Sequence, residues 1–215
     1  MENIAIVYRG FYFRNKNKKK TNSFDENILK NHIQYIYSNF KNITVFFHTY
    51  SVSDEKDAQL LELFKKYNIN IKSYIFEKDI NPKIYHSIIE SQKVIQNIDC
   101  FDNIINLRFD LMFKKSIINT DVDFNKFNFI FRGHIPGWKK NNKVSDLLYI
   151  FPPKFNQSFI TAIYSTRNIT SHGDAHFIYR PLTKLINLNN INFLLEDNYS
   201  SDTDACDNPL LKICR

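Results

Sequence analysis

The stretch NIINLRFDLMF, residues 103–113, decides the fold of this chain. Its first five residues are mostly apolar, which is typical of a strand buried on both faces. Arg108 and Asp110 follow at the end of this strand. In open α/β sheets, ligands bind beyond the carboxyl ends of the strands, so charged groups at such a position indicate a binding edge.

Three earlier runs are also predicted strands, the third of them alternating, and polar, charged or aromatic side chains follow each of them. They are residues 4–8 followed by Arg9-Gly10, residues 43–47 followed by His48-Thr49-Tyr50, and residues 69–76 followed by Glu77-Lys78-Asp79. If the four predicted strands are parallel, these groups converge on one edge of the sheet.

Helix signals lie between the predicted strands. Ser23 and Glu26 have the spacing of a capping box, Ser53 is a predicted N-cap, and Asn81-Pro82 has the form of a helix start. Residues 11–22 are polar and are predicted to be a loop. The resulting order, β-α-β-α-β-α-β, predicts a parallel sheet with helices on both faces.

The second half of the chain is less regular. Its predicted elements are strands 127–132 and 147–151, a helix over 154–165, a helix over 174–186 that should kink or stop at Pro181, and a strand over 191–195. We therefore expect a single α/β domain over 1–215, with a regular half (1–113) and an irregular half (114–215).

Composition narrows the class of protein. The chain has 215 residues, of which 43% are hydrophobic, which is too rich for disorder. No run of about 18 apolar residues occurs, so no membrane span is expected. Three cysteines without CxxC spacing and an amino terminus without a secretory signal indicate a soluble protein of a reducing compartment such as the cytoplasm.

The net charge of +7 indicates an anionic partner. Neither GxGxxG nor GxxxxGK[ST] is present, which argues against a dinucleotide-binding Rossmann domain and a P-loop NTPase. The basic run at 16–20 has no interleaved aromatics and matches no nucleic-acid-binding motif, so it is predicted to be a solvated loop. A non-catalytic nucleic-acid or polyanion-binding module remains an alternative because of the charge.

Asp110 is the most informative candidate. A carboxylate among apolar residues is costly unless it is paired or binds a cation, and Mg²⁺ or Mn²⁺ commonly bridges such a carboxylate to phosphates. Arg108 either pairs with Asp110 or holds a phosphate bidentately. A plain Arg–Asp pair that closes the strand is an equally good interpretation.

Candidates in the second half have two interpretations each. Within residues 171–176, Asp174 is either a general base or an acid at a helix start. Trp138, on the loop 133–145, either stacks on a sugar or base or covers the core. Asp202 and Asp204 are either a second set of metal ligands or surface groups.

The strand ends Arg9-Gly10, Phe47-His48-Thr49-Tyr50 and residues 106–113 resemble those of small GT-A-type glycosyltransferases, such as the domains that large DNA viruses encode. The resemblance spans most of the chain in element order. It implies a GT-A-like, Rossmann-like, mostly parallel mixed sheet flanked by helices. It also implies a soluble enzyme, in the host cytoplasm if the chain is viral.

The resemblance further implies a UDP-sugar site over the first four strands and a divalent metal, Mn²⁺ or Mg²⁺, between the diphosphate and a DxD-type motif. That motif would be 108–110, where Arg108 replaces the first Asp, so only Asp110 carries over as a metal ligand. A glycan or glycoprotein acceptor and a catalytic base, Asp174, would belong to the second half, with inversion of the sugar. The implied donor-binding residues are Arg9, Gly10, His48, Thr49, Tyr50, Arg108, Asp110, His134, Trp138, Asp146 and His172.

One other enzyme class has a similar sheet. A sugar nucleotidyltransferase would also bind Mg²⁺, but it normally has a Gly-rich loop after the first strand, which this chain lacks. The pattern of residues leaves the oligomeric state open.

Overall fold

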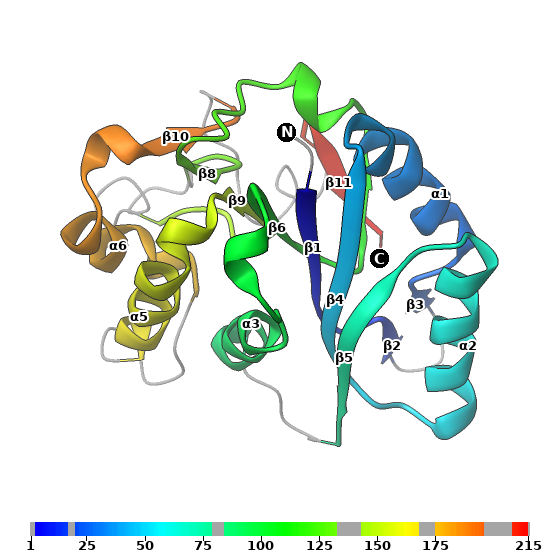
Figure 1. Cartoon of the computed structure of the whole chain (residues 1–215). Helices are drawn as coiled ribbons and strands as arrows, with labels where there is room; N and C mark the ends of the chain where they lie inside the picture. The colour runs from blue at the N-terminus through cyan, green and yellow to red at the C-terminus, as the bar shows by residue number, and fades with distance from the viewer. Residues whose placement is uncertain are drawn as a thin grey trace.

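A computed structural model gives the architecture of the chain (Figure 1). It describes residues 3–16, 20–78, 84–132, 143–167, 175–195 and 208–214. The centre of the fold is a seven-stranded sheet with the strand order β10-β8-β9-β6-β1-β4-β5.

The regular half supplies the parallel part of the sheet. Its strands are β1 (Asn3–Gly10), β4 (Asn42–Tyr50), β5 (Ile71–Glu77) and β6 (Asn103–Arg108). β1 pairs in parallel with β4 on one side and β6 on the other, and β5 continues the sheet beyond β4. The chain therefore winds outward to β5 and then returns to the far side of β1. This reversal between β1 and β6 is the kind of switch point where open α/β sheets bind ligands.

The irregular half supplies the mixed part. Its strands are β8 (Phe127–Phe129), β9 (Leu148–Phe151) and β10 (Ile191–Phe193). β9 is antiparallel to both β6 and β8, whereas β10 is parallel to β8. The prediction of a mixed, mostly parallel sheet is confirmed.

Two small ribbons accompany the main sheet. β7 (Leu111–Phe113) pairs with β11 (Leu211–Ile213), which brings the end of the chain beside the turn after β6. β2 (Phe13–Lys16) and β3 (Lys20–Ser23) form an antiparallel hairpin. The prediction of a loop over 11–22 was therefore wrong, because strand prediction depends on apolar alternation and these residues have none.

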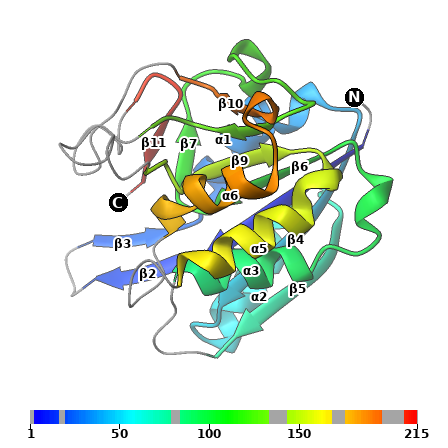
Figure 2. The ribbon, with the colours of Figure 1, turned by 90° about the vertical axis from the view of Figure 1, so that its left-hand side faces the viewer.

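Helices cover both faces of the sheet (Figures 1 and 2). α1 (Glu26–Tyr35) and α2 (Asp54–Lys66) pack on one face, and α3 (Ile84–Lys93), α5 (Asn156–Thr166) and α6 (Tyr179–Leu185) on the other. Short 3₁₀ turns cover Tyr37–Asn39, Ile98–Cys100, Ile117–Asn119, Pro153–Phe155, Ala175–Phe177 and Leu188–Asn190. Each face buries its own apolar cluster, so the sheet is a rigid platform for the groups at its edge.

The helix starts confirm one prediction and correct another. Ser53 caps α2 by accepting a hydrogen bond from the amide of Lys56 at 3.2 Å, as predicted. α1 is capped by Asp25, whose Oδ1 accepts from the amide of Ile28 at 3.0 Å, so the capping box starting at Ser23 was wrong. Asp25 is a cap as good as Ser and lies closer to the first apolar residues of the helix. The Asn81-Pro82 start lies outside the described residues.

Pro181 does not stop or kink a helix. α6 begins at Tyr179, so Pro181 is its third residue. The first amides of an α-helix have no acceptor within the helix, so a proline costs no hydrogen bond in the first turn. The prediction failed because it placed the helix start at residue 174, which would have put the proline in the helix interior. No helix in the described part of the chain is long and apolar enough to cross a membrane.

Candidate functional site

The carboxyl ends of β1, β4, β5 and β6 share one edge of the sheet, at the bottom of Figure 1. The pairing register sets Arg9 beside Arg108 on one side and beside His48 on the other. Tyr50 of β4 lies beside Glu77 of β5. The polar groups predicted to converge at the strand ends are thus brought together.

Arg9 is buried, with 2% of its surface exposed. Its Nε donates to Oδ1 of Asn106 at 2.6 Å, and its guanidinium also donates to the backbone carbonyl of Asp146. The guanidinium carbon lies 5.4 Å from the ring centroid of Tyr149. Arg9 therefore ties β1 to β6 and to the segment that leads into β9, and its buried positive charge lies directly below the edge of the sheet.

Arg108 and Asp110 form a bidentate pair. Nε and Nη2 of Arg108 donate to the two carboxylate oxygens of Asp110 at 2.8 and 2.5 Å. The two side chains are 15% and 12% exposed, so the pair reaches solvent. The amide of Cys214 donates to the carbonyl of Asp110 at 2.8 Å, which fixes the turn after β6. Planar bidentate geometry makes this one of the stronger kinds of ion pair.

Asp146 is a second, deeper carboxylate, 4% exposed. Its Oδ1 lies 3.8 Å from Nε2 of His176, whose Nδ1 contacts the carbonyl of Val144 at 2.8 Å. Burial on its own would raise the pKa of Asp146, but His176, Arg108 and Arg9 together hold it below its ordinary value. The carboxylate is therefore ionised at neutral pH and can accept hydrogen bonds.

Gly10, Thr49 and Tyr50 complete the ends of β1 and β4. Gly10 has φ of +83°, a left-handed conformation that favours glycine, and its carbonyl accepts from Oγ1 of Thr49 at 2.8 Å. Tyr50 is buried with its ring 4.9 Å from that of Phe11. These contacts turn the chain away from the sheet immediately after Arg9.

A cluster that the sequence did not indicate lies beside them. Nε2 of His48 lies 2.9 Å from Oε2 of Glu77, and Nε2 of His86 lies 3.0 Å from Oε1 of the same carboxylate. The sequence placed His48 and Glu77 at the ends of neighbouring strands but did not single out His86. The only signal was the position of Glu77 at a strand end. Nothing local predicts that α3 brings His86 back to it.

The remaining predicted site residues, His134, Trp138, His172 and Asp174, lie outside the described residues, as do Asp202 and Asp204. Their roles stay predictions. The described part of the site therefore comprises the donor-side strand ends, together with Asp146 and His176 from the second half.

The metal implied at Asp110 does not fit the described side chains in this conformation. Both oxygens of Asp110 accept from Arg108, so a cation would have to displace a guanidinium. Within the described ranges, the residues that could share a metal ion as a group of three or more His, Cys, Asp or Glu are His48, Glu77 and His86, not Asp110. We therefore derive no catalytic step through a metal at Asp110.

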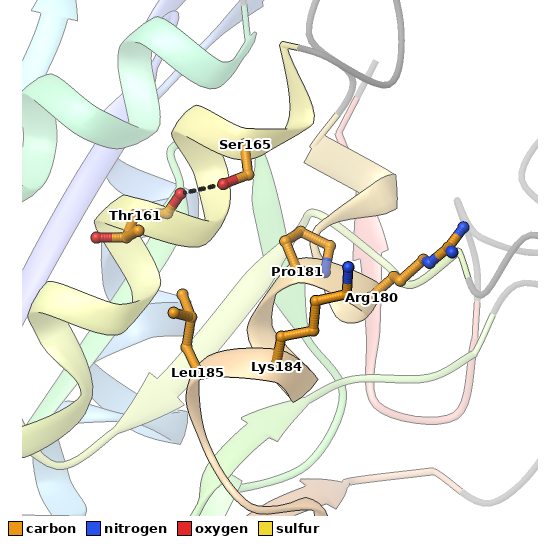
Figure 3. A pocket seen from close by; sticks show the side chains of 6 residues that line it. All are labelled: Thr161, Ser165, Arg180, Pro181, Lys184 and Leu185. Carbon is orange, nitrogen blue, oxygen red and sulfur yellow. Dashed lines mark hydrogen bonds between the residues drawn. The ribbon is translucent and has the colours of Figure 1, made fainter.

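A pocket between α5 and α6 is separate from this edge (Figure 3). All its lining residues belong to the two helices: Thr161, Ser165, Arg180, Pro181, Lys184 and Leu185. The Ser165 hydroxyl donates to the backbone carbonyl of Thr161 within α5. No lining residue comes from a strand, so the pocket does not extend the strand-end site.

No protein-family model matches the chain, and no curated protein sequence does either. Solved structures do match. An active-site variant of LgtC is 10% identical with a TM-score of 0.58, over 100% of this chain and 87% of that one. The 4-diphosphocytidyl-2C-methyl-D-erythritol synthase of Anaerococcus prevotii is 10% identical with a TM-score of 0.53, over 95% of this chain and 92% of that one.

A third match is the glycosyltransferase GlyE of Streptococcus pneumoniae in its apo form. It is 9% identical with a TM-score of 0.50, over 92% of this chain but only 46% of GlyE, so this chain spans less than half of GlyE's length. At sequence identities of 9–10%, these matches show a shared fold and not a shared activity. The chain has the GT-A-like fold of these glycosyltransferases, a mostly parallel mixed sheet flanked by helices, which confirms the fold that the resemblance implied.

Proposed function

We propose that this protein is a glycosyltransferase that takes its sugar from a UDP-sugar. The observation that carries the proposal is the pair of arginines, Arg9 and Arg108, side by side at the carboxyl ends of β1 and β6. They lie at the switch point of a GT-A-like sheet, where ligands of open α/β sheets bind. Two adjacent guanidinium groups favour a doubly charged anion such as a diphosphate.

Each described residue has a distinct part in this proposal. Arg108, which reaches solvent, donates to the diphosphate once it turns part of its guanidinium away from Asp110, and it then stabilises the charge that develops as UDP leaves. Arg9 raises the positive potential from beneath and fixes Asn106 and the Asp146 backbone. The ionised Asp146 accepts hydrogen bonds from hydroxyls of the donor.

The acceptor side rests on the resemblance. A hydroxyl of a glycan or glycoprotein would attack the anomeric carbon as the bond from that carbon to the diphosphate oxygen breaks, and UDP would leave with the bonding electrons. Asp174 is the proposed base that takes the hydroxyl proton, which gives inversion in a single displacement. A large DNA virus remains the source that the resemblance implies. Mn²⁺ or Mg²⁺ remains its implied cofactor.

Calorimetric titration with UDP tests the proposal, with Mn²⁺ and with a chelator in its place. We expect wild-type protein to bind UDP in at least one condition. If Mn²⁺ strengthens binding, Asp110→Ala tests whether Asp110 takes part: loss of that increment would show that the cation displaces Arg108 from this carboxylate. Lys93→Ala, an exposed substitution on α3, is the control and should bind as wild type does. Absence of UDP binding under both conditions would reject the proposal.

A sugar nucleotidyltransferase is the second candidate, favoured by the fold likeness to the synthase of Anaerococcus prevotii. The two activities release different products. A nucleotidyltransferase joins a nucleoside triphosphate to a sugar phosphate and releases pyrophosphate, whereas a glycosyltransferase releases UDP. An assay that measures pyrophosphate and UDP separates the two activities. It is run once with a nucleoside triphosphate and a sugar phosphate, and once with a UDP-sugar and an acceptor. Steeply salt-dependent retention on heparin without either product would instead favour the polyanion-binding alternative.

A further inference from the structure

Of the cluster of His48, Glu77 and His86, the resemblance implied donor binding for His48 alone, and the proposed transfer gives no step to any of the three. The cluster joins three elements: His48 lies two residues before the end of β4, Glu77 ends β5, and His86 lies in the first turn of α3 (Figure 1). The three ligand-type atoms all lie within 4.8 Å of one another. Such a meeting of two imidazoles and one carboxylate is a recurring ligand set for transition metals.

The distances are close to those that a metal needs. Oxygen and nitrogen ligands bind zinc at about 2.0–2.2 Å, so two ligands at a tetrahedral ion lie about 3.3 Å apart. The carboxylate of Glu77 is 2.9 Å from the nitrogen of His48 and 3.0 Å from that of His86. Opening each contact by a few tenths of an ångström therefore admits an ion. Glu77 and His86, 29% and 35% exposed, have room for that movement.

The imidazole of His48 is held in a fixed position. Its side chain is 2% exposed, so the surrounding residues keep the ring in one place, with Nε2 facing Glu77. A ligand that is already in position loses little conformational freedom when an ion binds.

We propose that His48, Glu77 and His86 form a binding site for a zinc-type divalent transition metal with one open coordination position. Imidazole nitrogen suits zinc and its neighbours, whereas Mg²⁺ and Ca²⁺ prefer sites made of oxygen alone. Three protein ligands leave a fourth position for water or an anionic oxygen. The exposed sides of Glu77 and His86 give that position access to solvent. One carboxylate against a divalent ion leaves a net charge of +1.

The same contacts also fit a metal-free trio. In it, Nε2–H of each imidazole donates to Glu77, and the buried Nδ1 of His48 carries no proton and needs no acceptor. A metal bound at Nε2 of a neutral imidazole shifts the ring proton to Nδ1, so no net proton leaves that ring. The two arrangements therefore differ in zinc binding, which the trio without a metal does not predict.

Calorimetric titration of chelator-treated protein with Zn²⁺ decides between them. We expect one site of higher affinity than any other, and no displacement by excess Mg²⁺. His86→Ala should weaken that site at least tenfold, since loss of even an outer-shell partner costs about 10–100-fold. Glu77→Gln, which keeps the size of the side chain, should do the same. Circular dichroism establishes that both variants are folded.

His176→Ala is the matched control, because His176 is also an imidazole close to a carboxylate on a neighbouring element. It should leave the Zn²⁺ affinity unchanged, and so should Asp110→Asn. Wild-type protein without such a site, or equal affinity in His86→Ala and His176→Ala, would overturn the inference. The titration contains no nucleotide, so its outcome is independent of the proposed sugar transfer.

Discussion

Two clusters of opposite chemistry lie at one edge of the same sheet. At the ends of β1 and β6, two arginines meet two carboxylates, Asp110 and Asp146. At the ends of β4 and β5, two imidazoles flank Glu77 alone. The first cluster contains guanidinium groups, which suit a phosphate, whereas the second contains imidazole nitrogens, which suit a metal.

The difference follows from where each cluster lies in the sheet. β1 and β6 are central, and the chain reverses direction between them, so their ends border the place where α/β sheets open to a ligand. β5 is an edge strand, and α3 follows it and returns over its end. The buried guanidinium of Arg9 in the central cluster has to be paired with groups from neighbouring strands, because an unpaired buried charge is costly. The outer cluster is made by the ends of β4 and β5 and by the first turn of α3.

The largest loss of stability is expected when Arg9, the buried member of the central cluster, is replaced. Arg9→Met removes the donors to Asn106 and to the Asp146 carbonyl, both of which stay buried. A buried acceptor without a partner costs about 1–3 kcal/mol, so the loss of unfolding free energy should be on the order of 3 kcal/mol. Urea denaturation measures it. Arg108→Met should cost less, because Arg108 and Asp110 reach solvent. The reverse order would contradict the assignment of Arg9 as the buried brace.

His32 is a buried histidine outside both clusters, and it predicts how the stability of the protein depends on pH. His32 lies between the Tyr8 hydroxyl, at 2.8 Å from Nδ1, and the Leu111 carbonyl, at 2.8 Å from Nε2. Burial lowers the pKa of His32 to about 4, opposed by its hydrogen bond to Leu111. The unfolded chain, with a histidine pKa of about 6.5, then binds more protons than the folded chain between pH 6.5 and 4.

Stability should therefore fall with falling pH across that window. Between pH 7 and pH 5 the contribution of His32 is a loss of about 2 kcal/mol, at about 1.4 kcal/mol per pH unit. His32→Gln keeps a donor for Leu111 and an acceptor for Tyr8, so the variant should lack this part of the loss. Denaturation curves at the two pH values measure the difference. Equal slopes for both proteins would show that His32 is not the group that titrates.

The smallest effect is expected at the start of α1, far from the edge chemistry. Asp25→Ala removes the cap of α1 and should cost about 1 kcal/mol of stability. Ser23→Ala should leave the cap in place and cost much less, although the sequence spacing alone favoured Ser23. Thermal denaturation of the two variants compares them. If Ser23→Ala lost more stability than Asp25→Ala, the capping box starting at Ser23 would be the correct assignment.

The strand-end groups could be predicted because apolar runs and the charged residues after them are local signals. Arg9, His48 and Arg108 were found in this way, and parallel pairing brought them together. His86 was missed because its approach to Glu77 depends on how α3 returns over β5, and no spacing in the sequence encodes that. The pairing of Arg108 with Asp110 was one of two interpretations, and only the fold shows how closely they meet.

UDP titration of matched variants tests the central claim, that the β1–β6 end of the edge binds the diphosphate. In a chelating buffer, Arg108→Ala should weaken UDP binding about 10–100-fold, the equivalent of about 1.5–3 kcal/mol for a charged hydrogen bond. His86→Ala, at the β4–β5 end, should bind UDP as wild type does. Loss of affinity in His86→Ala together with unchanged affinity in Arg108→Ala would contradict the account.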